Sequence, residues 1–433
     1  MCIVVYTIGR TDMKIAWFVN IVMPVLARDL GWWETSLGGW LTGQMEGIKQ
    51  IGNELSIICA DSNAHSIISR RIDGVDFFVV PQSKTEDLCD SIRNVLSIVN
   101  PDVFHIFGTE TDASLAAINA ADLDRTVVSI QGLVTVCAKH VGDGIPEKYY
   151  KKTLLKAMGK RLLHGSIIEE DAIRLQKQGE KETEIIRKSK HIIGRTEWDK
   201  CNVELINADA DYHKCNEILR NSFYEGCWQV ERCEKHTIFV SQSASPIKGF
   251  HQLLKAMPSV LNKYPDAHIC VSGAPLSGLN KRNILKQWAV EYLCGYQGYI
   301  EKLVRENKLY GKIRFLNYLS ESQMKNQMLK ANVFVLPSNI ENSPNSLCEA
   351  MLLGVPCVAA DVGGVKDLLV SPEEGLIYDH SDVEKLSECI NSIFASNELA
   401  ERMSKACRKH ALATHNPQKN TEDLLHVYRK IMG

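Results

Sequence analysis

Apolar segments of strand length alternate with helical segments along most of the 433-residue chain. In the first half we expect strands near 14–20, 54–60, 76–80, 102–107, 126–130 and 190–194. A second series is expected near 237–241, 267–271, 313–316, 333–336, 356–360 and 375–377. Short apolar runs separated by helices are typical of parallel sheets that are covered on both faces. The alternation therefore predicts an α/β protein.

The alternation pauses between about Tyr212 and Lys235, where the sequence is polar and aperiodic. A chain of this length is too long for one ordinary core. We therefore expect two Rossmann-like, doubly wound parallel-sheet domains that face a cleft, where ligands bind at the carboxyl ends of the strands. The expected division is an extension at 1–12, a first domain at 13–215, a linker at 216–236, a second domain at 237–415 and a last helix at 416–433.

Charge and cysteine content exclude several classes of protein. The net charge of −2 argues against nucleic acid as a partner, because nucleic-acid-binding domains are usually strongly basic. The fourteen cysteines show no paired CxxC spacing, so we expect no zinc site and reduced thiols, which favours a cytoplasmic location. No run of eighteen apolar residues is present to span a membrane.

The segment from Val333 to Asp367 combines an apolar strand, a polar loop and the start of a helix. Glu341 and Glu349 stand eight positions apart, on either side of the loop end and the helix start. A helix N-terminus offers unpaired amides to a phosphate, and carboxylates accept hydrogen bonds from hydroxyls. The segment therefore predicts a site for a ligand that carries both groups.

A purely structural interpretation of the same segment also exists. Ser346 and Glu349 have the spacing of a capping box, and Ser343-Pro344 resembles an N-cap followed by a proline at the first helical position. Glu349 is then only a cap. Glu341 lies in the loop and has no such role.

Other candidates stand at the ends of expected strands. Gly38 and Gly39 follow the first strand and open a helix, where a ligand can approach the backbone, although simple helix packing also explains them. Lys248 follows the first strand of the second domain and suits a phosphate, although a lone lysine is more often a solvated surface residue. His105 and Gln131 end two strands, and His105 is equally well explained as a hydrogen-bonded core histidine.

Two further segments carry charge. Residues 148–161 contain six basic residues and no acid, with leucines and a methionine along one side. Such a helix either contacts an anionic membrane or packs on its own domain. The expected membrane-contacting segment is 148–163. Asp209-Ala-Asp211 has the form of a metal-binding motif, which we attribute to chance because so short a pattern recurs freely.

Several of these segments resemble one known family, the retaining glycosyltransferases with the GT-B fold of family four, also called glycosyl transferases group one. The segments ENSPNSLCEAMLLG and VPCVAADVGG resemble its paired-glutamate signature with a trailing Gly-Gly. VSQSASPIKGF is similar to its phosphate-lysine segment, and KIRFLNYLSESQM to its base-binding segment. SLGGW and PDVFHIFGTE are similar to landmarks of its first domain.

The resemblance implies roles for these residues. Glu341 would contact the donor sugar and Glu349 the ribose, while amides near Asn345, Ser346 and Leu347 would hold the diphosphate beside Lys248. Gly38 and Gly39 would approach the same phosphates, the last helix would return to the first domain, and no metal or cofactor would be needed.

The chain departs from the family pattern at two positions. Gln242 stands where the family usually has an arginine before the lysine. The strand that carries Gln131 normally ends in a histidine near the sugar. With one cation missing, more of the diphosphate charge is expected to fall on Lys248 and the helix amides.

We therefore expect a retaining, metal-independent transferase that moves a sugar from a nucleotide-diphosphate donor to an acceptor hydroxyl. The expected acceptor is a sugar or a lipid-linked intermediate of surface polysaccharide or glycolipid synthesis, at the inner face of the membrane. A nucleotide-sugar-binding protein without transferase activity and a GT-B sugar-nucleotide epimerase remain alternatives.

Overall fold

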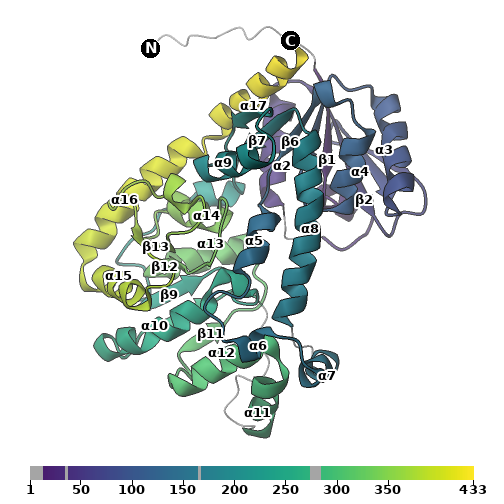
Figure 1. Ribbon diagram of the computed structural model, residues 1–433. Helices are drawn as coiled ribbons and strands as arrows, with labels where there is room; N and C mark the ends of the chain where they lie inside the picture. The colour runs from purple at the N-terminus through teal and green to yellow at the C-terminus, as the bar shows by residue number, and fades with distance from the viewer. Residues whose placement is uncertain (1–12, 35–37, 164–166, 274–283) are drawn as a thin grey trace, which may run out of the picture.

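The computed structural model describes residues 13–34, 38–163, 167–273 and 284–433, which form two α/β domains (Figure 1). The expected extension at 1–12 and residues 36–37 of the glycine segment lie outside this range. Among the described residues, no helix has both the length and the apolar character to cross a membrane.

The first domain is built on an eight-stranded sheet in the order β3-β4-β2-β1-β5-β6-β7-β8, in which only the β3–β4 pair is antiparallel. Its strands are β1 (Lys14–Val19), β2 (Glu54–Asp61), β3 (Ile68–Ile72), β4 (Val75–Pro81), β5 (Val103–Phe107), β6 (Thr126–Ser129), β7 (His191–Gly194) and β8 (Asp211–Lys214). Its helices are α1 (Pro24–Asp29), α2 (Gly39–Gln50), α3 (Thr85–Val99), α4 (Asp112–Ala120), α5 (Val134–His140), α6 (Glu147–Tyr150), α7 (Leu154–Leu163), α8 (Ile168–Lys188) and α9 (Glu197–Ile206).

The second domain has a six-stranded parallel sheet in the order β11-β10-β9-β12-β13-β14. Its strands are β9 (Thr237–Val240), β10 (His268–Val271), β11 (Ile313–Phe315), β12 (Val333–Leu336), β13 (Cys357–Ala360) and β14 (Leu376–Tyr378). Its helices are α10 (Phe250–Lys263), α11 (Ile284–Leu293), α12 (Gly295–Glu306), α13 (Glu321–Lys330), α14 (Asn345–Leu353), α15 (Val383–Ala395) and α16 (Asn397–Thr414). The two sheets confirm the expected fold class.

All twelve expected strands are present, and the two that were not expected are β3 and β8. Both lie at the edges of the first sheet, where one side has no neighbouring strand. Most of β3 is exposed, and β8 has the polar sequence DYHK. Edge strands need no continuous apolar run, so the apolar pattern does not reveal them.

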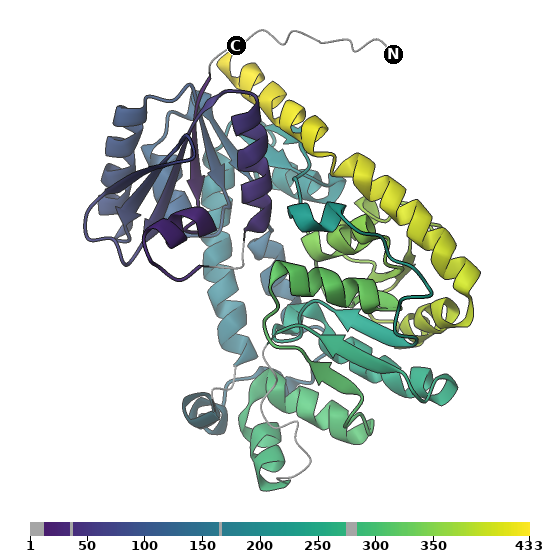
Figure 2. The same cartoon turned by 180° about the vertical axis from the view of Figure 1, so that it is seen from behind.

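The last helix, α17 (Pro417–Met432), crosses from the second domain to the first and packs on α2 (Figures 1 and 2). Its Tyr428 is fully buried, where its hydroxyl accepts a hydrogen bond from Trp17 Nε1 at 3.0 Å and lies 2.6 Å from His105 Nδ1. A helix from the end of the chain thus completes the core of the first domain.

The segment around α6 connects the domains in the opposite direction. Val141, Tyr149, Ile168 and Ala172 precede the expected linker, yet their side chains join the core of the second domain. Tyr149 packs against Tyr299 of α12, with ring centroids 5.1 Å apart. The packing of the domains is therefore interlocked and does not depend on the linker alone.

Candidate functional site

The N-terminus of α14 lies directly after the loop that follows β12. Pro344 precedes the helix without a side-chain cap, and Gly354 ends it in the left-handed conformation. The amide of Leu347 donates to the carbonyl of Pro344 at 3.0 Å, so it is already engaged. Asn345 and Ser346 supply the first two amides of the helix, for which an α-helix contains no acceptor. These two amides are therefore the ones available to an anion.

The structural interpretation of this segment is wrong in its details. Ser346 lies inside the helix and does not cap it, so no capping box with Glu349 exists. Ser343 is not the N-cap, because Pro344 occupies that position, and the buried Ser343 hydroxyl has no hydrogen-bond partner. The explanation of Glu349 as a helix cap is thereby removed.

Glu341 is buried in the loop between β12 and α14 and is paired with Lys248. The Nζ atom of Lys248 lies 2.7 Å from Glu341 Oε1, which also accepts a hydrogen bond from Ser338 Oγ at 2.7 Å. Lys248 ends a short 3-10 helix at Pro246–Lys248, and its side chain is 33% exposed, compared with 8% for Glu341. The lysine thus covers the acid on its solvent side.

Glycine is required where this loop meets the next strand connection. Gly363 has φ +53°, and a Cβ atom there would collide with the carbonyl of Glu341. The amide of Gly364 donates to that same carbonyl at 3.1 Å. The Gly-Gly pair therefore holds the Glu341 loop in place by close backbone contact.

Glu349 forms a bidentate ion pair with Arg220, whose two N–H groups lie 2.6 Å from the two carboxylate oxygens. Both side chains are largely buried, at 5% exposed for Glu349 and 19% for Arg220. Burial raises the pKa of Glu349, and the Arg220 guanidinium opposes that rise. Each acid of the signature is therefore paired with one cation.

Sequence reasoning did not identify Arg220, which lies within the expected linker 216–236. Its partner Glu349 is 129 positions away, so no local pattern links them. A Cβ atom at Gly39 would collide with the aliphatic part of Arg220. Arg220 therefore lies between the N-terminal end of α2 and Glu349, and it brings Gly39 into the site.

Gly38 acts at the same place through its backbone. It is the N-cap of α2 with φ +73°, and a Cβ atom there would collide with Ile21. The two glycines thus let the start of α2 approach both the β1 loop and Arg220.

Gln131 and Asn345 meet in a network that joins the two domains. Glu217 Oε1 accepts from Gln131 Nε2 at 3.3 Å, while Glu217 Oε2 accepts from Asn345 Nδ2 at 3.1 Å. Arg195 donates to Glu217 at 2.9 Å, to Asn345 Oδ1 at 2.7 Å and to the carbonyl of Ser343 at 3.0 Å. Arg195 and Glu217 were not expected from the sequence. Only their contacts with Asn345 and Ser343 of the second domain reveal them.

The catalytic role expected for His105 requires correction. His105 is fully buried, and its ring nitrogens lie 2.6 Å from the Tyr428 hydroxyl and 2.6 Å from Ser129 Oγ. Burial lowers the pKa of His105 to about 3, so the ring is neutral. Since both nitrogens are engaged within the first domain, His105 is the hydrogen-bonded core histidine that the alternative describes.

Buried polar atoms without a partner gather at this site. Twelve such side-chain atoms occur in the described part of the chain, and five belong to residues at the facing edges of the two sheets. These residues are Arg195, Ser243, Asn339, Asn342 and Ser343. Buried polar groups in native proteins are normally hydrogen-bonded, so this concentration suits a surface that binds a polar ligand.

A polar cavity lies at the carboxyl end of the first sheet. Asn20 follows β1, Gln82 follows β4 and Glu110 follows β5, and all three line it together with residues of α4 and α8. The side-chain amide of Asn20 (Nδ2) donates a hydrogen bond to the backbone carbonyl of Phe107 at 3.1 Å. The cavity is thus made mainly of groups that hydrogen-bond to hydroxyls.

The basic helix α7 lies beside α11 (Figure 1), and its apolar side is exposed. Leu154, Leu155, Met158 and Leu162 are 88%, 58%, 55% and 67% exposed. Lys156, on the opposite side, is buried and donates to the carbonyl of Lys151. Several basic residues are already paired with acids, through Lys151–Glu147, Lys152–Glu170 and Lys160–Glu170. The apolar face, rather than the charge, is the unusual feature of this helix.

Residues 229–410, most of the second domain, match the family model described as "Glycosyl transferases group 1". The chain resembles the glycosyl transferases of group 1. The match includes Lys248, Glu341 and Glu349, and it agrees with the resemblance that the sequence motifs indicate.

Several similar proteins are named as glycosyltransferases. Spore coat protein SA of Bacillus subtilis is 26% identical over 46% of this chain and 49% of its own length. A GDP-mannose-dependent monoacylated alpha-(1-6)-phosphatidylinositol monomannoside mannosyltransferase of Corynebacterium glutamicum is 30% identical over 39% of this chain and 40% of its own length. The chain thus spans about half or less of the length of these relatives. The putative glycosyltransferase YtcC of Bacillus subtilis is 22% identical over 83% of this chain and 79% of its own length.

Solved structures show that the GT-B fold extends over both domains. Sucrose-phosphate synthase from Thermosynechococcus elongatus superposes with a TM-score of 0.65 at 14% identity, covering 96% of this chain and 98% of the other. Anabaena Alr3699/HepE in complex with UDP superposes with a TM-score of 0.63 at 14% identity, covering 96% of this chain and 100% of the other. WaaG, a glycosyltransferase involved in lipopolysaccharide biosynthesis, superposes with a TM-score of 0.61 at 13% identity, covering 97% of this chain and 100% of the other.

Proposed function

We propose that this protein transfers a sugar from a nucleotide-diphosphate donor to an acceptor hydroxyl, with retention of the anomeric configuration. The observation that carries the proposal is the pairing of two buried acids with two cations beside a free helix N-terminus, through Lys248–Glu341 and Arg220–Glu349. The match of residues 229–410 to the glycosyl transferases of group 1 and the similarity to a GDP-mannose-dependent mannosyltransferase support the reaction class.

A nucleotide-diphosphate-sugar has groups that suit both members of each pair. Its phosphates carry the negative charge that lysine, arginine and helix amides stabilise. Its ribose and sugar hydroxyls donate hydrogen bonds to carboxylates. In the proposal, the donor enters between the partners, so that Glu349 accepts from the ribose and Glu341 from the sugar, while the two cations turn to the diphosphate.

Arg220 supplies the positive charge that is missing at Gln242. Its guanidinium lies beside Glu349, and its aliphatic part lies against Gly39 at the start of α2. In our proposal, the guanidinium turns from Glu349 to the diphosphate, which lies between the starts of α2 and α14. An arginine is suited to this position because its planar group binds phosphate oxygens in a bidentate manner.

The chemical step in this proposal is the departure of the nucleoside diphosphate. Negative charge develops on the leaving phosphate as the glycosidic bond breaks, and Lys248, Arg220 and the amides of Asn345 and Ser346 stabilise that charge. The acceptor attacks from the face that the phosphate leaves, and a phosphate oxygen takes the acceptor proton. We assign no metal and no cofactor to this chemistry, because Lys248, Arg220 and the helix amides supply the positive charge in the proposal.

The acceptor in our proposal occupies the polar cavity of the first sheet, close to Asn20, Gln82 and Glu110. A sugar or another polyhydroxylated group suits these amides and carboxylates. The relatives include a protein named for a phosphatidylinositol monomannoside and one involved in lipopolysaccharide biosynthesis, which favours a lipid-linked acceptor for this chain too.

We further propose that α7 contacts the inner face of the cytoplasmic membrane. Four large apolar side chains on one exposed helix face gain free energy when they leave water for the headgroup and acyl boundary. This contact would keep a lipid-linked acceptor near the first domain.

A transfer assay with a panel of nucleotide-sugars and hydroxylated acceptors tests the proposed reaction. We expect one donor to yield a glycosylated product, and NMR of the new linkage to show the anomeric configuration of the donor. An inverted product contradicts retention. Donor binding without any product indicates a binding protein, and an altered nucleotide-sugar formed without acceptor indicates an epimerase.

A further inference from the structure

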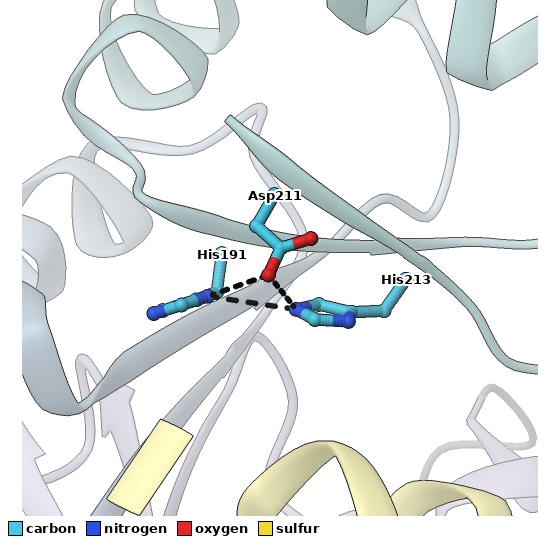
Figure 3. A group of neighbouring side chains, drawn as sticks. All are labelled: His191, Asp211 and His213. Atoms are coloured by element: carbon cyan, nitrogen blue, oxygen red, sulfur yellow. Dashed lines mark hydrogen bonds and ion pairs between the residues drawn. The ribbon is translucent and has the colours of Figure 1, made fainter. Parts of the chain in front are cut away.

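His191, Asp211 and His213 point toward one another at the outer edge of the first sheet (Figure 3). His191 begins β7, whereas Asp211 and His213 lie on the neighbouring strand β8. Backbone pairing places Asp211 opposite His191 and His213 opposite Ile193, so the three side chains share one face of the sheet. These starting ends of β7 and β8 take no part in the proposed transfer site.

The three facing atoms form a nearly regular triangle. His213 Nε2 lies 3.5 Å from His191 Nδ1 and 3.7 Å from Asp211 Oδ2, and His191 Nδ1 lies 3.9 Å from Asp211 Oδ2. A point equidistant from all three atoms lies about 2.1 Å from each, which equals the usual length of a bond from zinc to a histidine nitrogen or a carboxylate oxygen. The three atoms are therefore spaced as ligands of one such cation.

The triangle is rich in hydrogen-bond acceptors. At 3.5 Å the contact between the two imidazoles is long for a hydrogen bond, and the rings are stacked with an interplanar angle of 29°. Burial lowers the pKa of His191 and of His213, and Asp211 opposes both shifts. Neutral imidazoles beside a carboxylate are the form of these residues that binds a metal.

The charged groups around the triangle come from three sides. Lys430 of α17 lies 2.6 Å from Asp211 Oδ2, and its side chain is 52% exposed. Lys430, Lys190 and His426 lower the pKa of one or both imidazoles, while Asp124 raises that of His191. Lys430 therefore occupies the carboxylate as a competing cation, and its exposure leaves it free to turn into solvent.

We propose that His191, Asp211 and His213 form a site for a borderline divalent cation of the zinc type. Two nitrogen ligands and one oxygen ligand match the preference of Zn²⁺, and water completes the coordination. The site is separate from sugar transfer, because Arg195 and Thr196, which face the second domain, lie beyond the opposite end of β7. The metal would join β7 to β8 under the last turn of α17.

This site also gives Asp211 a role that the Asp209-Ala-Asp211 motif does not describe. The backbone amide of Asp209 donates a hydrogen bond to Asn207 Oδ1, and Asp209 is not part of the triangle. The proposed ligand set is therefore two histidines and one aspartate, brought together by the sheet rather than by the motif.

Titration of the metal-free full-length protein with Co²⁺, followed by its ligand-field absorption, tests the proposal. We expect one equivalent to bind with bands of nitrogen and oxygen ligation, and Zn²⁺ to displace it. Asp211→Asn and His213→Ala should each weaken binding by roughly tenfold or more. Lys430→Met, which removes the competing cation, should tighten binding by about two- to fivefold. His236→Ala, in an ion pair with Asp266 in the second domain, serves as the matched control and should change nothing.

Two outcomes would overturn the proposal. Binding that persists unchanged in both Asp211→Asn and His213→Ala, or that shows thiolate charge-transfer bands, would place the cation elsewhere. An absence of binding in both the wild-type protein and Lys430→Met would show that the triangle takes no cation. The side chain of Asp211 is 43% exposed, compared with 8% for His213, so its variant remains informative even if His213→Ala does not fold.

Discussion

At the scale of single residues, the site consists of acids that the free protein already neutralises. Lys248 covers Glu341, and Arg220 covers Glu349. A buried ion pair is weak evidence for stability, because desolvation opposes the attraction. In our proposal, the two pairs are present because a ligand uses all four groups.

Replacement of Lys248 by alanine should reduce turnover with a nucleotide-sugar by roughly ten- to hundredfold, because one charged hydrogen bond to the leaving phosphate is lost. Steady-state kinetics with saturating acceptor measures the change. Lys366→Ala is a suitable control, since Lys366 is an exposed lysine of the same domain that pairs with Asp361. Unchanged turnover in Lys248→Ala would remove the residue from the mechanism.

Arg220 and Glu349 lend themselves to a double-mutant cycle. Arg220→Met or Glu349→Gln alone should lower the free energy of unfolding, by up to about 3–5 kcal/mol for Arg220→Met, which leaves a buried charge unpaired. The double variant should lose less than the sum. Donor affinity, measured by calorimetry, should fall in all three variants. Restored stability together with wild-type donor affinity in the double variant would mean that the pair is only structural.

At the scale of elements, local sequence predicts what local forces determine. The apolar runs indicate β12 and β13, and the expected helix starts lie close to those of α14 and α17. Arg220, Arg195 and Glu217 escape prediction because their partners are more than twenty positions away or on another domain. The misplaced role of His105 has the same cause, since its partner Tyr428 is 323 positions away.

The hydroxyl of Tyr428 should stabilise the attachment of α17 to the first domain. Tyr428→Phe leaves the buried Trp17 N–H and His105 without this partner, which should cost about 1–3 kcal/mol in the free energy of unfolding. Chemical denaturation measures the loss, and donor affinity should not change. Tyr318→Phe is the control, because Tyr318 is 81% exposed. Equal stability of the two variants would contradict this role.

The exposed face of α7 predicts membrane binding. Replacing Leu154, Leu155, Met158 and Leu162 by serine should abolish flotation with vesicles that contain anionic lipid, because the apolar area is lost. Flotation of the wild-type protein should decrease on neutral vesicles, where the basic residues gain nothing. Leu205→Ser, at an 86% exposed leucine of α9, is the control. Equal flotation of the wild-type protein and the serine variant would contradict a role for α7.

At the scale of the whole molecule, the domains are held together at several separate places. Arg195 bonds the loop before α14, His251 of α10 lies 3.0 Å from the carbonyl of Asp143, and α17 spans both domains. Closure around a donor can exclude water from the cleft. Opening of the two domains would break the contacts of Arg195 with Asn345 and Ser343, while α17 would remain as a connection.

Stability should decrease as the pH falls below about 6.5. Burial lowers the pKa of His251 to about 3 and that of His415 to about 4, so the unfolded chain binds these protons first. Each such histidine should contribute a loss of about 1.4 kcal/mol per pH unit between its two pKa values. Urea unfolding of His251→Gln at pH 7 and pH 5.5 should show a shallower loss than the wild-type protein. An equal loss would show that His251 does not contribute.

Equilibrium binding of the donor tests the central claim most directly. Calorimetric titration should show that a nucleotide-diphosphate-sugar binds at least about tenfold more tightly than its nucleoside, since the cations and helix amides act on the diphosphate. In Lys248→Ala most of this preference should disappear. Equal affinity for the nucleoside and the nucleotide-sugar, or a preference that survives in Lys248→Ala, would contradict the account.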